Sequence, residues 1–461
     1  MRRLRLFILL GTFFVFNIYV HAQVEGVFFV IAGLRGLGIG SSGEAPPAVY
    51  SLKINDINSL KNVPKLDRKA DPSFYRGIIA YNTQEKKDIP QGHYVWNGTK
   101  WVTVYSDAPA GSLKGDLEAL HALSQLNKDN DDTKKDWAIW DIDLDNIDNP
   151  KNQKLKGVIF RNINGEPRVE ALKISYYNDL RNITITKGLE ALVYLTLRSS
   201  PCTQLNLSLP NLVYLGCDAN NSLSVIGLEC PRLAYLQIDR TTLSKMTLNC
   251  PGLDVLCAPK CLPETIDLSK CINLTELDCN SNQLSVLDLS KNTKLSKLSC
   301  RENELTELDV SQNTELTELV CSSNKLTELN VSQNTELTKL DCSSNELTTL
   351  DVSNNPKLNR LVCLEAQLER LDVSKCIELE YLFCNRNNLT ELNITNSPKL
   401  KVLDCYFNKL TALDVSNNKK LVDLRISQNN LTEIDLSQNK QLEYFSFGGN
   451  PWKVAPKWRK D

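Results

Sequence analysis

A repeat of about 21 residues runs through most of the chain after residue 169 and constrains its fold more than any other feature. One repeat contains Leu337, Leu340, Cys342, Asn345 and Leu347, and matching residues recur 21 positions before and after most of them. A unit this short cannot bury its own apolar side chains, so consecutive units must stack into a solenoid. The repeats start at Val169, Leu192, Leu212, Leu233, Leu253, Leu274, Leu295, Leu316, Leu337, Leu358, Leu379, Leu400 and Leu421, with a partial repeat from Leu442.

The spacing within one repeat predicts its strands and turns. The first half of the repeat from Leu337 reads L-x-x-L-x-C-x-x-N-x-L, which matches the leucine-rich-repeat signature. Leu340 and Cys342 alternate with outward residues, so we expect a short strand that points both side chains into the core. Asn345 should turn the chain and satisfy buried backbone groups of adjacent turns through its amide. We therefore predict a β-rich leucine-rich-repeat solenoid with parallel strands on the concave face and a β-like opposite wall.

A column of cysteines fills one inward position in seven consecutive repeats. The same position holds Ile174, Leu197, Ala258 and Phe447 in other repeats, so it requires apolar volume, which a buried thiol supplies. Neighbours in a parallel ladder point the same way, which suits a disulfide badly. Disulfides and a metal site remain as alternatives, although the spacing is not that of zinc ligands. The predicted structural thiols are Cys279, Cys300, Cys321, Cys342, Cys363, Cys384 and Cys405.

Other cysteines lie outside this column. Cys271 and Cys376 take the turn position that Asn292 holds in its own repeat, and the repeat signature allows this exchange. Cys257 falls at an outward strand position. It is therefore expected to be an exposed thiol or to pair with Cys261.

The segments outside the repeats predict an export signal, a small β module and two caps. Arg2, Arg3 and Arg5 precede an apolar run that ends at a cleavage-like Val20–Ala22, which indicates a signal peptide; the run is short for the alternative, a membrane anchor. Asn97-Gly98 predicts a β-hairpin turn. The predicted organisation is a signal peptide (1–22), a leader or linker (23–65), a small β module (66–110), an N-terminal cap (111–168), the repeats (169–450) and a C-terminal cap (451–461).

The two caps should protect the open ends of the stack. Residues from Asp116 to Leu126 are expected to form an amphipathic helix with Leu117, Leu120 and Leu123 on one face. This helix would cover the first repeat and shield its apolar edge from water. At the far end, Asn450–Trp452 and Pro456–Trp458 are expected to form a minimal cap.

The 21-residue repeat with a core cysteine column resembles the internalin J type of leucine-rich-repeat surface protein and similar repeats in surface proteins of Bacteroidetes. The resemblance covers about Leu253 to Asn450, and more loosely everything from Val169. It implies a secreted or cell-surface protein that functions in adhesion or biofilm formation and is not an enzyme. The stretch from Gly77 to Trp101 is similar to a short module common on Bacteroidetes surface proteins.

Charge and motif content narrow the function classes. The chain carries 53 basic and 55 acidic residues, so no basic excess points to nucleic acid. No nucleotide loop, zinc-protease motif or G-x-S-x-G occurs, and the mature chain has only His93 and His121. Asp129, Asp131 and Asp132 are similar to a calcium loop but lack its Gly and final Glu.

We therefore expect an exported, non-enzymatic protein without cofactor, metal or membrane span in the mature chain. Its predicted partner is a protein or glycan on host or neighbouring bacterial cells. The alternative is a secreted enzyme with its catalytic part in the N-terminal region and the repeats as a substrate-binding arm.

Outward strand positions predict where a partner binds. In the middle of the array, Glu276, Lys297, Glu318 and Lys339 alternate in sign across adjacent strands, so that stretch should be a neutral scaffold. Tyrosine and arginine collect at the two ends instead, as in binding hot spots, although such tyrosines can also merely cover a sheet. The predicted partner-binding residues are Tyr194, Tyr214, Tyr235, Arg360, Tyr381, Phe383, Tyr406 and Tyr444.

Overall fold

The computed structural model divides the chain into two compact units, Met1–Pro109 and Ala110–Asp461. In the first unit it describes short strands between residues 30 and 103. In the second it describes residues 111–125, 146, 155, 157–163, 165–175, 182–200 and 202–456. The predicted signal peptide and the Asp129–Asp132 segment lie outside the described residues.

The described strands of the first unit form one five-stranded sheet in the order β1-β3-β4-β5, with β2 also paired to β3. The pairing of β4 with β5 is antiparallel and joins Trp96 to Trp101, as the predicted hairpin requires. Strands β1 and β2 belong to the segment expected to be a leader, so that segment contributes to the sheet. The strands are β1 (Val30–Ile31), β2 (Tyr50–Leu52), β3 (Ile78–Asn82), β4 (Gly92–Trp96) and β5 (Trp101–Thr103).

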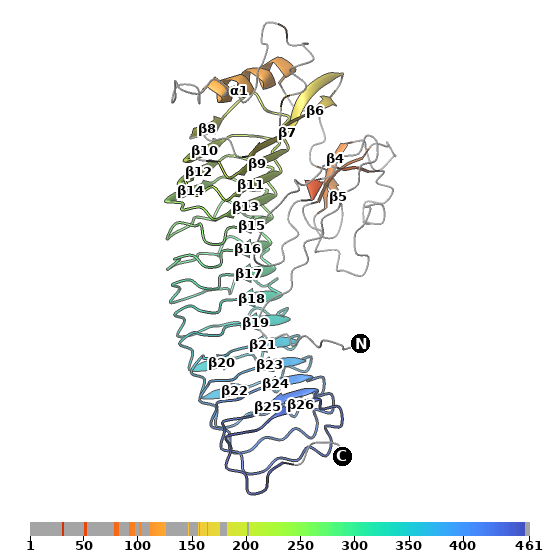
Figure 1. Ribbon diagram of the computed structural model, residues 1–461, viewed down its shortest axis with the longest axis vertical. Helices are drawn as coiled ribbons and strands as arrows, with labels where there is room; N and C mark the ends of the chain where they lie inside the picture. The colour runs from red at the N-terminus through yellow and green to blue at the C-terminus, as the bar shows by residue number, and fades with distance from the viewer. Residues whose placement is uncertain are drawn as a thin grey trace, which may run out of the picture. The chain divides into compact units, whose positions relative to one another are not determined.

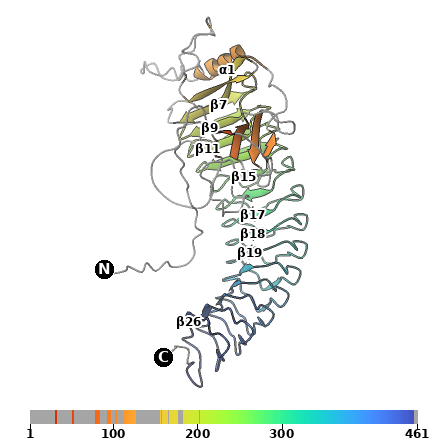
Figure 2. The ribbon, with the colours of Figure 1, turned by 90° about the vertical axis from the view of Figure 1, so that its right-hand side faces the viewer.

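The second unit is a leucine-rich-repeat solenoid, as the repeat predicts (Figure 1). Fifteen of its described strands form one sheet in which the neighbours from β7 onwards are parallel, and this sheet lies on the concave side of the curved stack (Figure 2). The strands are β6 (Val158–Ile163), β7 (Glu166–Ser175), β9 (Tyr194–Arg198), β11 (Tyr214–Asp218), β13 (Tyr235–Asp239), β15 (Val255–Cys257), β16 (Glu276–Asp278), β17 (Lys297–Ser299), β18 (Glu318–Val320), β19 (Lys339–Asp341), β21 (Arg360–Val362), β23 (Tyr381–Phe383), β24 (Val402–Asp404), β25 (Asp423–Arg425) and β26 (Tyr444–Ser446).

The opposite wall is β-like only in places. Four strands pair in parallel near the N-terminal end, and two more pair further along the stack. Between these sheets the wall consists of turns in which Asp accepts a hydrogen bond from the backbone two residues on; Ser311 N donates to Asp309 Oδ1 at 2.9 Å. The strands are β8 (Asn182–Ile185), β10 (Gln204–Leu207), β12 (Val225–Leu228), β14 (Lys245–Leu248), β20 (Thr349–Asp351) and β22 (Arg370–Asp372).

Asparagine amides join each turn to the preceding one. Asn324 Nδ2 donates to the carbonyl oxygens of Cys300 and Cys321 at 3.0 Å each, and its Oδ1 accepts from Leu305 N at 3.1 Å. The same three bonds recur at Asn303 and Asn345. The predicted role of this asparagine column is therefore confirmed.

A second asparagine column lies at the opposite turn. Asn334 Nδ2 donates to Val310 O at 3.0 Å and to Asn313 O at 2.9 Å, and its side chain is buried. Both turns of every such repeat are thus fixed to the repeat before, which orients the outward strand residues of successive turns in one row.

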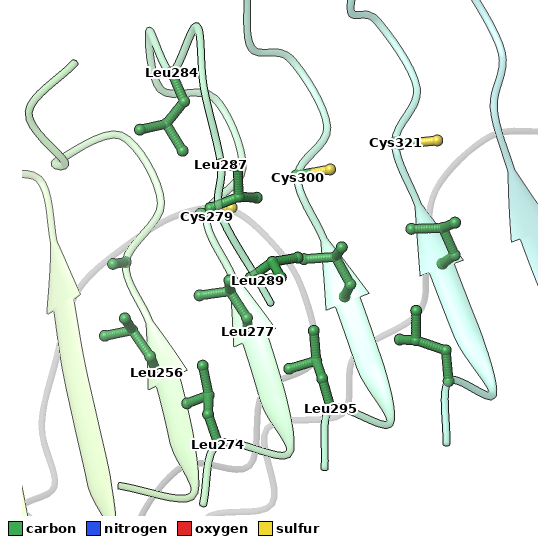
Figure 3. Packing of buried hydrophobic residues seen from close by; sticks show 14 of the residues in the cluster. Leu256, Leu274, Leu277, Cys279, Leu284, Leu287, Leu289, Leu295, Cys300 and Cys321 are labelled. Atoms are coloured by element: carbon green, nitrogen blue, oxygen red, sulfur yellow. The ribbon is translucent and has the colours of Figure 1, made fainter. Parts of the chain in front are cut away.

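Leucines and cysteines fill the interior between the two walls (Figure 3). Cys300 and Cys321 project in the same direction from consecutive turns (Figure 3). All fifteen cysteines of the chain are buried thiols rather than disulfides. Burial raises the pKa of Cys300 to about 12, which keeps the thiol protonated and unreactive at neutral pH.

Cys257 departs from the expectation of an exposed or disulfide-paired thiol. Its side chain is only 3% exposed, and its Sγ donates to Asp278 Oδ2 on the next strand at 3.4 Å. An outward position in the repeat frame therefore does not ensure exposure, because the neighbouring strand supplies a side chain that covers it.

Helix α1 (Leu113–Gln125), the only α-helix among the described residues, packs against β7 and β8 at the N-terminal end of the stack. Leu117 and Leu120 are fully buried, which confirms the predicted helical cap. The repeat pattern did not predict the polar contact that fixes it. Arg168 donates from Nε and Nη2 to the two carboxylate oxygens of buried Asp116 at 2.8 and 2.9 Å, and Val169 N donates to the same carboxylate at 2.8 Å. Removing Arg168 would take from the buried Asp116 carboxylate the cation that compensates its charge, so this pair specifies where the helix docks.

The far end is closed by Asn450 and Trp452. Asn450 Nδ2 donates to Ile426 O at 2.9 Å, and Trp452 Nε1 donates to Phe447 O at 3.0 Å. The Trp452 ring meets the Phe447 ring edge-on at 6.2 Å between centroids. These contacts are those of a small cap on the last turn.

We predict that the column thiols stabilise the fold as apolar volume. Native protein treated with an alkylating reagent should show Cys279 to Cys405 unmodified by mass spectrometry, and denatured protein should react fully without added reductant. Replacing Cys342 by Ser should lower the free energy of unfolding by about 1–3 kcal/mol, because it buries a hydroxyl among apolar groups. Cys342→Ala is the control, since Ala258 occupies the column naturally. Disulfides among these residues, or rapid native alkylation, would contradict the prediction.

Candidate interaction surface

The middle of the concave face is neutralised by cross-strand ion pairs. Lys297 Nζ lies 3.1 Å from Glu276 Oε1, and Lys339 Nζ lies 2.6 Å from Glu318 Oε1. In each pair the two residues are register partners on adjacent parallel strands. The predicted charge neutralisation across adjacent strands is confirmed, and each of these charges already has a partner in the protein.

The N-terminal tyrosines stack as expected but are not exposed. Tyr194 and Tyr214 stack at 4.6 Å between ring centroids, and Tyr214 and Tyr235 stack at 5.4 Å. Their side chains are 1%, 5% and 5% exposed. Burial also raises the pKa of the Tyr194 phenol well above its usual value.

The prediction that these three tyrosines present a binding surface was therefore wrong. Nearly parallel rings in consecutive turns cover one another's faces, and the Tyr214 hydroxyl is occupied by a hydrogen bond to Gln237 Oε1 at 3.4 Å. These three tyrosines are therefore not part of the candidate surface.

The C-terminal aromatic residues differ, because they remain partly exposed and stack with cations. Arg360 on β21 is the register partner of Tyr381 on β23, and Phe383 lies two residues further along β23. The guanidinium carbon of Arg360 is 4.8 Å from the Phe383 ring centroid and 5.9 Å from that of Tyr381. Lys401 Nζ lies 6.0 Å from the Tyr381 centroid. We call Arg360, Tyr381 and Phe383 the Arg360 cluster.

Tyr406 and Tyr444 each stack with a different arginine. Arg386 Nε donates to the Tyr406 hydroxyl at 2.9 Å, and its Cζ lies 5.8 Å from that ring. Arg425 Cζ lies 5.2 Å from the ring of Tyr444, which is 51% exposed. Every predicted C-terminal aromatic residue is thus next to a cation.

Sequence reasoning missed the cations Arg386, Lys401 and Arg425, as well as Phe407, which is 58% exposed. The 21-residue frame could have identified two of these cations. Lys401 lies 21 residues after Glu380, and Arg386 lies 21 residues after Glu365, so the repeat frame places each opposite an acid.

A buried carboxyl group lies within this part of the sheet. Asp404 is the register partner of Phe383 on one side and of Arg425 on the other. Its side chain is buried, which raises its pKa to about 6, although Tyr406 N, 3.4 Å from Oδ1, and Arg425, 3.6 Å away, both favour the charged form. Asp423 opposes ionisation of Asp404 but is itself bonded to Arg425 Nη2 at 2.8 Å.

Two further findings concern the described part of the chain. No three His, Cys, Asp or Glu side chains there are grouped so that they could hold a metal ion. None of the helical segments described has the length and apolar character needed to cross a bilayer.

Comparison with known proteins supports the fold. The functional domain of InlJ from Listeria monocytogenes, which includes a cysteine ladder, is 33% identical to this chain with a TM-score of 0.53. The match covers 62% of this chain and 64% of that one, so the chain spans just under two thirds of its length. The predicted resemblance to internalin J is confirmed at the level of structure.

Two further solved structures are similar to this chain over a comparable stretch. A leucine-rich-repeat protein of Leptospira interrogans is 22% identical with a TM-score of 0.48, and covers 61% of this chain and 78% of its own. Internalin F of Listeria monocytogenes is 20% identical with a TM-score of 0.45, and covers 61% and 81%. Comparisons with protein-family profiles and with curated proteins give no match.

The pKa of Asp404 predicts a pH-dependent stability. Because the folded-state pKa of about 6 exceeds the ordinary value of 3.8, the folded state binds the proton more tightly. Proton binding by Asp404 therefore stabilises the folded state. This stabilisation is fully present below pH 3.8 and is lost as the pH rises through about 6. Two pKa units correspond to at most about 3 kcal/mol.

Replacing Asp404 by Asn should therefore flatten the dependence of the unfolding midpoint in urea between pH 4 and pH 7. Asp414→Asn is the matched control. Asp414 is exposed and its pKa is lowered, first by its hydrogen bonds from Ser416, so its contribution is lost only as the pH falls below 3.8. If the unfolding midpoint varies with pH identically in the wild-type protein and in Asp404→Asn, the pKa of Asp404 is not raised as proposed.

Proposed function

We propose that this protein binds a macromolecular partner on the C-terminal part of its concave face, through the Arg360 cluster together with Tyr406 and Tyr444. One observation carries the proposal. The aromatic side chains there are partly exposed and stacked with cations, whereas the tyrosines at the other end are buried and the middle is ion-paired. Tyrosine and arginine are the residue types that most often dominate binding energy at interfaces.

The scaffold behind these residues favours tight binding. Their strands are hydrogen-bonded to neighbours in register, and the leucines and cysteines beneath them are fully buried. Cation–π contacts hold the aromatic rings and guanidinium groups in place before a partner arrives. Less conformational entropy is therefore lost on binding than at a flexible loop.

We infer that the protein is secreted or displayed at the cell surface. Its role there would be adhesion to host cells, to neighbouring bacteria or to a biofilm matrix. The signal-like N-terminal sequence and the resemblance to internalin J support it. A protein or a glycan on the opposing surface is the partner class that we propose.

An enzymatic role has less support. Its catalytic part would fall within residues 66–165, most of which lie outside the described residues, and no catalytic constellation occurs in their sequence. The thiols, which are the strongest nucleophiles of the second unit, are buried and have raised pKa values where a shift is resolved.

The test starts with capture of a partner by the purified full chain from host and bacterial extracts, followed by measurement of its Kd. Replacing Tyr381, Phe383 and Tyr406 together by Ala should weaken binding by at least about 30-fold, since each is expected to be a hot-spot residue. Circular dichroism and melting should show that the variant still folds.

The control replaces Thr349 and Arg370, which are exposed on the opposite wall, by Ala and should leave the Kd unchanged. If the folded triple variant binds like the wild-type protein, the C-terminal concave face is not the site.

A further inference from the structure

The alternation of charge along the concave sheet breaks at Arg360. Lys297 is paired with Glu276 and Lys339 with Glu318, so the next outward position would continue the pattern with an acid. It holds Arg360 instead, whose register partners are Lys339 on one side and Tyr381 on the other. No acid is therefore in register with this guanidinium.

The other cations of the C-terminal surface are already paired. Lys401 Nζ donates to Glu380 Oε2 at 2.6 Å, Arg386 Nη1 to Glu365 Oε1 at 3.1 Å, and Arg425 Nη2 to Asp423 Oδ2 at 2.8 Å. Among the described residues, Arg360 makes contacts with ring faces but no hydrogen bond or ion pair. An exposed guanidinium in this position has its N–H donors available to a ligand.

We infer that the Arg360 cluster binds a carboxylate of an acidic peptide segment on a protein partner, while Tyr381 and Phe383 pack against an adjacent apolar side chain. This inference rests on the proposed function and names the chemistry of its partner. The planar guanidinium matches a carboxylate with two parallel N–H···O bonds. Stacking on Phe383 fixes the plane in advance, which reduces the entropy lost on binding.

The surroundings favour an isolated carboxylate over a polyanion. Glu365 and Glu380, on the turns that carry Arg360 and Tyr381, are each paired with a neighbouring cation, so Arg360 is left as a single unpaired positive charge. One unpaired charge matches a single carboxylate better than the closely spaced charges of a sulfated polysaccharide or a nucleic acid. Phe383 and the exposed Phe407 also offer apolar surface that such chains do not match. A peptide with acidic and apolar residues in alternation complements both features.

The test uses the full chain and a fluorescein-labelled peptide of alternating Asp and Leu residues, with a labelled Asn–Leu peptide as the neutral comparison and fluorescein-labelled polygalacturonate as a third probe. Fluorescence anisotropy should show saturable binding of the Asp–Leu peptide, about tenfold tighter than that of the Asn–Leu peptide. Replacing Arg360 by Gln should weaken it about tenfold, a loss typical of one charge-assisted bidentate contact. Arg360→Lys should bind the Asp–Leu peptide with an affinity between those of the wild-type protein and Arg360→Gln, because lysine keeps the positive charge but lacks the two parallel N–H donors of the guanidinium.

Arg370→Gln is the matched control, since Arg370 is an exposed arginine on the opposite wall, and it should bind like the wild-type protein. Absence of saturable peptide binding, or equal binding by Arg360→Gln, would overturn the inference. Tight, Arg360-dependent binding of polygalacturonate without binding of the peptide would overturn it in favour of an acidic glycan. If Arg360→Gln has no effect while the triple aromatic variant loses the captured partner, the proposed function stands and only the carboxylate assignment fails.

Discussion

The asparagine amides that join consecutive turns are the interaction on which the rest of this structure depends. Each turn leaves backbone N–H and C=O groups buried where the chain reverses, and an unpaired buried group costs about 1–3 kcal/mol. Asn345 satisfies three of them: Cys342 O in its own turn, and Cys321 O and Leu326 N in the preceding turn. The bond pattern forces successive turns into the same register, so outward residues 21 apart become neighbours. Every property of the concave face, including ion pairs and ring stacking, follows from that registration.

The interior needs less specificity than the turns. The inward column accepts cysteine, isoleucine, leucine, alanine and phenylalanine, which indicates that volume rather than chemistry is required there. The ends of the stack need more specific contacts than the interior, because an open end exposes apolar surface and strand edges. The buried Asp116–Arg168 pair at one end and the Trp452–Phe447 contact at the other meet this need with chemistry that no repeat carries.

The structural features that repeat every 21 residues could be predicted from the sequence. The turns, the inward leucines and cysteines, the role of Asn345 and the Glu318–Lys339 pair all follow from a 21-residue frame. Contacts that occur once could not be predicted, because the frame does not relate Arg168 to Asp116. The frame also distinguishes inward from outward positions but not covered from exposed ones, which is why Tyr194 was assigned wrongly. The residue before each asparagine of the column that contains Asn345 adopts a left-handed backbone conformation, with φ near +52° at Ser344 and +56° at Phe407. Residue types such as Ser and Phe do not predict this conformation from the sequence.

We propose that one end of a uniform scaffold is specialised for binding, whereas the middle takes no part in it. Hydroxyl-radical footprinting by mass spectrometry tests this most directly, because aromatic side chains oxidise readily when exposed to solvent. A captured partner should protect Tyr381, Tyr406 and Tyr444 from oxidation and should leave the oxidation of peptides from residues 276–339 unchanged. Unchanged oxidation of those three tyrosines, with protection in the middle turns or on the opposite wall, would contradict it.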